Sequence, residues 1–276
     1  MKKLIALSAL ALFLCSCAGV NVKKPDIGSV KKIAILGVTS PEEYKDIEST
    51  KEKKKSLLAT VAGNLLADNV EMLTDAQVEV ITYGAKALTN TFNGISGWSV
   101  IPMEDVTSNE EVRHFYGDDK SSMEAFAELF RSTRYVTPKG MSPILYEQLN
   151  PRDKHWVNGV RVDEAYRRSI GKLCETLDVD AIAVAEYNFF YEKGMMTNIT
   201  NNVTTYVFVD VVLVDKNGEM ILYTDRGWDK FEGDDNAHYS SGHLDYGASK
   251  TIAAYKSNID KAMSEFKKQA DKKIGR

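Results

Sequence analysis

The stretch VTTYVFVDVVLVDKNGEMIL, residues 203–222, decides the fold. Residues 203–214 are rich in β-branched and aromatic side chains, which favour a long β-strand. Asn217-Gly218 is a pair typical of tight hairpin turns, and the apolar residues after it predict a returning strand. The stretch therefore predicts an antiparallel β-hairpin that belongs to a larger sheet.

Three more strands are predicted upstream of this hairpin. KKIAILGV, residues 31–38, is a short apolar run of the kind that forms a buried strand. GWSVIP, residues 97–102, predicts a second strand that Pro102 stops. Residues 178–193 predict a third strand, which enters the core at Ala181.

Apolar residues at helical spacing predict helices between and after these strands. The expected helices cover residues 50–73, 78–88, 105–116, 121–131, 162–177 and 250–272, with the second either separate from the first or its continuation. We therefore expect the α/β class, with a single mixed β-sheet packed with α-helices, ending in a β-hairpin and a C-terminal helix.

The N-terminus has the pattern of a secretory signal. Lys2 and Lys3 precede an apolar run over residues 4–14, which is shorter than the ~20 residues that a transmembrane helix needs. The tetrad LCSC, residues 14–17, resembles the lipobox of bacterial lipoproteins. This resemblance implies removal of residues 1–16 and acylation of Cys17, and Ala18 at the next position implies the outer membrane. An ordinary signal-peptidase site is the alternative.

The remaining chain divides into a tether and one domain. Residues 17–31 predict a lipidated N-terminus with a short tether. The polar residues 18–30 contain Pro25 and Gly28 and reach at most ~47 Å. Residues 32–276 predict a single α/β domain. The turn-rich part of residues 113–160 predicts an insertion across the surface of this domain.

Composition and motifs argue against several classes of function. The net charge of −4 provides no basic field for nucleic acid. The sequence contains no G-x-S-x-G elbow, H-E-x-x-H helix, P-loop or dinucleotide-binding glycine pattern, so we expect no enzyme activity and no cofactor. Cys174 would be the one thiol left after processing, and we expect it to be buried. The best candidates for metal ligands are Asp234, Asp235, His238, His243 and Asp245. Their spacing matches no compact metal site and is more typical of a solvated polar loop, so no metal is expected.

The insertion is the best candidate for partner recognition, because it mixes cationic and aromatic side chains that protein interfaces favour. The candidate partner-binding residues are Arg131, Arg134, Tyr135, Lys139, Tyr146, Arg152 and Trp156. The alternative is that the aromatic residues among them simply pin the insertion to the sheet.

Three stretches together resemble the periplasmic α/β domain of the curli-secretion lipoprotein family. They are KKIAILGV at residues 31–38, LDVDAIAVAEY at residues 177–187 and the hairpin stretch at residues 203–222. Similar modules occur in lipoproteins that activate peptidoglycan synthases and in the N-terminal domain of the Tol-system propeller protein. The resemblance covers residues 31–38, the helix around Leu57 and residues 162–228. It implies an envelope-facing α/β domain and does not imply a reaction.

The sequence departs from this family where the family inserts membrane-spanning hairpins. Only KGMMTNITNN, residues 193–202, separates the third and fourth strands, which is too short for such a hairpin. We therefore expect a non-enzymatic, membrane-anchored scaffold or assembly factor of the bacterial envelope that faces the periplasm and binds another envelope protein or itself. The alternative is a subunit of an oligomeric outer-membrane secretion assembly without transmembrane hairpins of its own.

Overall fold

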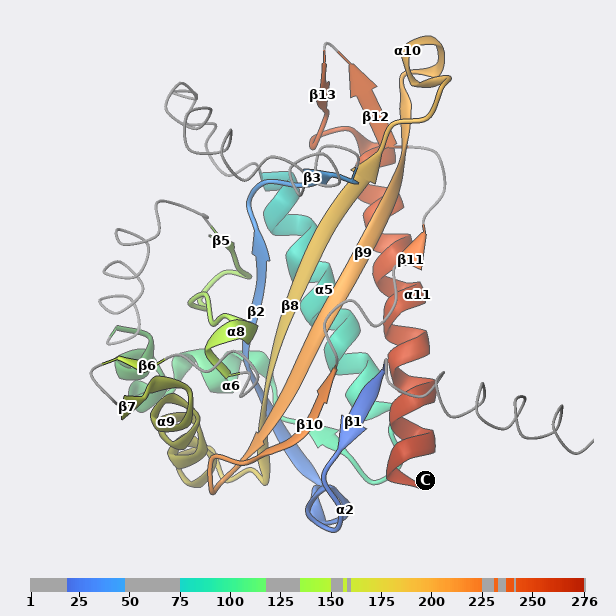
Figure 1. The fold of residues 1–276 in the computed structure, drawn as a ribbon. Helices are drawn as coiled ribbons and strands as arrows, with labels where there is room; N and C mark the ends of the chain where they lie inside the picture. The colour runs from blue at the N-terminus through green and yellow to red at the C-terminus, as the bar shows by residue number, and fades with distance from the viewer. Residues whose placement is uncertain are drawn as a thin grey trace, which may run out of the picture.

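The computed structural model describes residues 19–47, 75–117, 135–149, 156–157, 160–224, 231–232, 237–240 and 242–275. Its main sheet is mixed (Figure 1). Across this sheet, neighbouring strands follow the order β1 (Val20–Val22), β10 (Met220–Thr224), β9 (Asn202–Asp215), β8 (Ala181–Glu192), β2 (Lys32–Pro41) and β4 (Ser99–Val100). β2 runs parallel to β8 and β4, and the other neighbours on this path are antiparallel. The predicted α/β class is confirmed.

The hairpin that the sequence predicts is formed by β9 and β10. Gly218 has a φ of +78° at the turn, a backbone conformation that glycine adopts readily. The side-chain oxygen Oδ1 of Asp215 accepts hydrogen bonds from the backbone N–H groups of Asn217 and Glu219, both at 2.9 Å. These bonds fix the turn together with the backbone hydrogen bond that the N–H of Asp215 donates to the carbonyl of Glu219 at 3.0 Å.

β8 and β9 form the longest pairing of the sheet. Their register runs from Ala181 opposite Asp215 to Glu192 opposite Thr204. Alternate side chains of both strands point to opposite faces, so each face carries its own core. The helix α10 (Thr197–Thr200) lies at the far end of this pair, where β8 turns into β9 (Figure 1).

Helices cover both faces of the sheet. α5 (Asp75–Asn93) and α11 (Ser249–Ile274) pack on one face, with Tyr187, Phe92 and Phe266 among the fully buried side chains. The other face is covered by α6 (Met103–Ser108), the helical residues 110–117, α8 (Tyr146–Leu149) and α9 (Val162–Thr176). The predicted helices at 78–88, 162–177 and 250–272 are thus confirmed, whereas those at 50–73 and 121–131 lie outside the described residues.

Short strands extend the sheet at its ends. β3 (Lys45–Asp46) pairs with β8, and β5 (Tyr135–Val136) pairs with β2. β11 (Phe231–Glu232) and β12 (Ala237–Ser240) both pair with β9, and β13 (His243–Leu244) pairs with β12. A separate hairpin joins β6 (Trp156–Val157) to β7 (Val160–Arg161).

The predicted tether is wrong for the residues that the structure describes. Residues 20–22 form β1 on the edge of the sheet, and α2 (Asp26–Ser29) follows directly. Val20, Ile27 and Val30 are each only 1% exposed, so they belong to the core. Residues 20–30 therefore belong to the folded body, because the apolar side chains of this polar segment pack into its core.

The segment 135–149 is likewise not a surface insertion. β5 pairs with β2, and the side chains of Val136, Ile144 and Leu149 are buried at 0 to 1% exposure. The hydroxyl of Thr39 in β2 donates to the carbonyl of Ile144 at 3.2 Å, and Gly37 faces the same side chain. Prolines break the periodicity of this segment, yet its apolar residues pack into the cores on both faces of the sheet. Val136 belongs to the core under α5 and α11, and Ile144 and Leu149 belong to the core on the other face.

Candidate functional site

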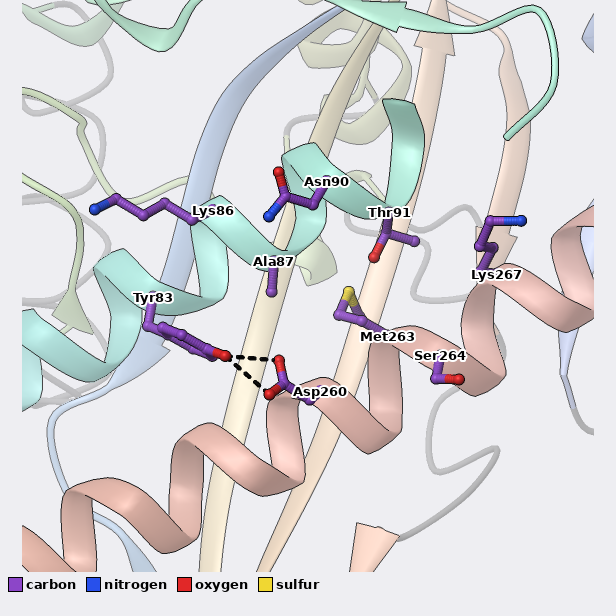
Figure 2. Close-up of a pocket in the computed structure, with 9 residues that line it drawn as sticks. All are labelled: Tyr83, Lys86, Ala87, Asn90, Thr91, Asp260, Met263, Ser264 and Lys267. Carbon is purple, nitrogen blue, oxygen red and sulfur yellow. Dashed lines mark hydrogen bonds between the residues drawn. The ribbon is translucent and has the colours of Figure 1, made fainter. Parts of the chain in front are cut away.

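A groove lies between α5 and α11 on the outer side of the molecule and encloses about 430 Å³. The two helices run in the same direction, since Glu79 lies beside Lys256 and Tyr83 beside Asp260. Figure 2 shows that Tyr83, Ala87, Asn90 and other residues of α5 face residues of α11 across this groove.

One end of the groove is closed by a polar bridge. The Tyr83 hydroxyl lies 2.9 Å and 2.8 Å from the two carboxylate oxygens of Asp260 and donates to them (Figure 2). This hydrogen bond is the main cause that raises the pKa of Tyr83 above its usual value. The ammonium of Lys256 pairs with Glu79 at 2.6 Å and lies 5.4 Å from the centroid of the Tyr83 ring.

The floor of the groove is apolar and its rim is charged. Ala87 and Met263 come from the two helices and face each other between them (Figure 2). Lys86 and Lys267 stand on opposite sides, and Lys267 pairs with Asp271 at 2.6 Å. The residues that line the groove include neither cysteine nor histidine. The groove thus offers shape, apolar contact and hydrogen bonding, which are the means of binding a partner.

A second hollow, of about 700 Å³, lies where β2 begins and the β9–β10 turn and the end of α9 meet. The Asp180 side chain accepts hydrogen bonds from the backbone N–H groups of Lys31 and Lys32, at 2.8 Å and 2.9 Å. The ammonium of Lys32 pairs with Asp178 at 2.8 Å and holds the pKa of that carboxyl below its usual value. These contacts tie the entry of β2 to the end of α9.

Cys174 lines this second hollow. Burial raises the pKa of its thiol to about 12. Because the thiolate is the nucleophile and the metal ligand, a thiol with this pKa stays protonated and inert at neutral pH. The expectation that Cys174 is buried is confirmed, and this burial supports a structural role for the residue.

The sequence-predicted site residues are not brought together in the part of the chain that the structure describes. Cys17, Arg131, Arg134 and Arg152 lie outside it, and only the backbone of Trp156 in β6 is described. Tyr135 in β5 is partly exposed, and Lys139 is exposed in the turn that follows.

Tyr146 is not available to a partner. Its side chain is 1% exposed, and its hydroxyl donates to the backbone carbonyl of Thr224. Its backbone N–H donates to Glu186 at 3.2 Å. This residue pins its segment to the sheet, as the alternative interpretation expects, and its assignment as a partner-binding residue is corrected.

The candidate metal loop is described in part. Asp245 Oδ1 accepts hydrogen bonds from the N–H groups of Gly247 and Ala248, both at 3.1 Å, just before α11. His243 is exposed, and Asp234 and Asp235 lie outside the described residues. Among the residues that are described, no three His, Cys, Asp or Glu side chains are grouped so that they could hold a metal ion.

The groove between α5 and α11 is the feature that sequence reasoning missed. The helical periodicity of each element indicates its buried face but not which helix lies next to it. The spacing of Tyr83, Ala87 and Asn90 on α5 could have indicated the groove. These residues stand at i, i+4 and i+7, so they form one stripe of the helix beside its buried face.

No protein-family model matches the sequence, and no curated protein matches it significantly.

No helix within the described ranges is long and apolar enough to span a bilayer.

Proposed function

We propose that the chain is a non-enzymatic lipoprotein, anchored through acylated Cys17, that serves as a scaffold or assembly factor of the bacterial cell envelope. The observation that carries this proposal is that Val20, three positions after Cys17 in the sequence, is already buried in the folded body. An acyl group on Cys17 would hold the body close to lipid, because only Ala18 and Gly19 lie between Cys17 and β1 in the sequence. Ala18 and the lipobox-like tetrad support an outer-membrane protein that faces the periplasm.

The groove between α5 and α11 supports protein binding as the activity. Interfaces combine an apolar centre with a polar rim and favour Tyr and Met, and the groove has Ala87 and Met263 at its floor and Tyr83 at one end. The two helices are packed on the sheet by Phe92 and Phe266, whose rings lie 6.0 Å apart. Such a rigid surface can bind a partner with little loss of conformational freedom.

The anchor is tested by growing cells that express the full chain with labelled palmitate. We expect the label in the wild-type protein and none in Cys17→Ser, with Cys174→Ser as the matched control that retains it. Unlabelled wild-type protein that is recovered in a freely soluble form would contradict the proposal.

The groove is tested by photo-crosslinking in cells. A crosslinking amino acid at Asn90, on the rim of the groove, should give discrete products with an envelope protein. The matched control places the same amino acid at Lys172, an exposed position of α9 on the opposite side of the sheet. Equal product patterns at the two positions would remove the groove from the proposal.

Light scattering on the acylated chain in detergent tests the nature of the partner. A scaffold that binds a different protein should be monomeric apart from the detergent. A stable ring of many copies would instead support a subunit of an oligomeric secretion assembly, which is the alternative function.

A further inference from the structure

Three large apolar side chains are fully or largely exposed at the tip of the β8–β9 pair. Met195 is 101% exposed, Met196 57% and Ile199 73%, and they are the large hydrophobic side chains that stand out on the surface of the described residues. We call these three residues the apolar tip. It projects at α10, beyond the helices that cover the sheet (Figure 1). Exposed apolar clusters of this kind mark contacts with proteins or membranes.

The surroundings of the apolar tip suit lipid. Residues 194–209 contain no charged residue and no histidine. At the base of the tip, the Lys193 ammonium pairs with Asp46 at 2.9 Å and lies 5.2 Å from the centre of the Tyr239 ring. The rings of Tyr191 and Tyr239 lie 5.9 Å apart at the same level. Tyrosine and lysine below an uncharged apolar tip match the order of groups at a bilayer surface.

A row of lysines connects the region of the tip with the region of the lipid anchor. α11 begins beside β12, where the Thr251 hydroxyl accepts a hydrogen bond from the His238 N–H at 2.9 Å, and β12 pairs with Asn202 and Val203 just after the tip. The same helix ends beside β1. Four exposed lysines, spaced so that they share one side of α11, form the lysine row: Lys250, Lys261, Lys268 and Lys272.

We propose that Met195, Met196 and Ile199 insert into the boundary between headgroups and acyl chains of the bilayer that carries the chain, with the lysine row facing anionic headgroups. This inference rests on the proposed lipid anchor. The occupant is lipid because Cys17 precedes Gly19 by two residues, at most about 7 Å of chain, beside the end of α11, and the tip lies near the start of the same helix. A bilayer that holds the anchor also reaches the tip when α11, which has 26 residues and is ~39 Å long, lies along its surface. The lysine row adds attraction to anionic lipid, and its charge is complementary to that surface.

The insertion is tested by tryptophan fluorescence on the full chain reconstituted in vesicles of phosphatidylethanolamine and phosphatidylglycerol. Met196→Trp should emit at shorter wavelength and be quenched by brominated lipids more strongly than the wild-type protein. Lys172→Trp, on the exposed side of α9, is the matched control and should show no added quenching. If Met196→Trp shows no more quenching than Lys172→Trp in vesicle-bound protein, the inference is wrong.

A second experiment separates this inference from the anchor. Cys17→Ser protein should retain weak flotation with the anionic vesicles and lose it in high salt, since screening weakens surface charges. Changing Met195, Met196 and Ile199 together to Ser should lower this binding by at least about tenfold, which corresponds to about 1.4 kcal/mol. If the acylated chain floats while the apolar tip makes no difference in Cys17→Ser, the anchor stands and the insertion fails. If the tip instead crosslinks to a second copy or another protein without lipid quenching, lipid is not its occupant.

Discussion

The backbone N–H of Val20 donates a hydrogen bond to the side-chain Oε1 of Gln269 at 3.2 Å, which joins the first described strand to the last helix. Gly19 has a φ of +146°, a backbone conformation that residues with a side chain rarely adopt, so this position favours glycine. This contact brings the exit of the chain toward Cys17 to the side of α11.

Replacing Gln269 with Ala should loosen β1 from the body. The loss of one partly buried hydrogen bond is worth about 1 kcal/mol, and the edge strand should open locally before the rest of the sheet. Hydrogen exchange at Val20 and Val22 measures this opening. Lys268→Ala, on the exposed side of the same turn, should leave the protection unchanged. Equal protection in the two variants would show that the Gln269 contact does not hold β1.

The central hairpin could be predicted because its pattern is local. β-Branched residues at 203–214 and the Asn217-Gly218 turn determine strand, turn and register within one stretch of chain. The docking of Val20–Val22 could not be predicted in the same way. Three residues carry too little periodicity, and they pair with a strand about 200 positions later in the sequence rather than with their neighbours.

The candidate site was even less accessible from the sequence. The groove needs α5 and α11 to lie side by side, and contacts such as Tyr83 with Asp260 join residues 177 positions apart. Tyr146 shows the reverse error, because an aromatic residue in a turn-rich segment is equally typical of an interface and of a core. Only the packing of its ring under β10 decides between them.

Gly171→Ala should destabilise the fold although alanine favours helices. An added Cβ would lie 2.7 Å from the backbone N of Gly218 and 2.9 Å from the carbonyl of Asp215, so α9 would have to move away from the hairpin turn. We expect a loss of about 1–3 kcal/mol, typical of overpacking, measured as a lower urea midpoint. Gly28→Ala is the control, since nothing lies within 4 Å of its added Cβ. Equal midpoints for the two variants would contradict the close packing of α9 on the turn.

The thiol of Cys174 should be unreactive in the folded protein. Its pKa is raised to about 12 by burial, so alkylation by iodoacetamide at neutral pH should occur only after unfolding in urea. The folded state holds the thiol proton more tightly, so this group lowers stability as pH rises above the ordinary thiol pKa of about 8.5. Cys174→Ala should therefore flatten the alkaline decline in the urea midpoint, and rapid labelling of native protein would refute the assignment.

Tyr83→Phe should weaken the joining of α5 to α11 without closing the groove. The variant keeps the ring beside Lys256 and removes only the hydroxyl that donates to Asp260. Because the pair is exposed, the loss of stability should be only about 0.5–1 kcal/mol. The raised pKa of Tyr83 means that its contribution is complete below the ordinary tyrosine pKa of about 10 and is lost as pH rises through the higher folded value. Urea midpoints at neutral and strongly alkaline pH measure both effects, and wild type and Tyr83→Phe should differ at neutral pH and converge at alkaline pH. A difference that persists above the folded pKa would mean that the ring, rather than the hydroxyl bridge to Asp260, joins the two helices.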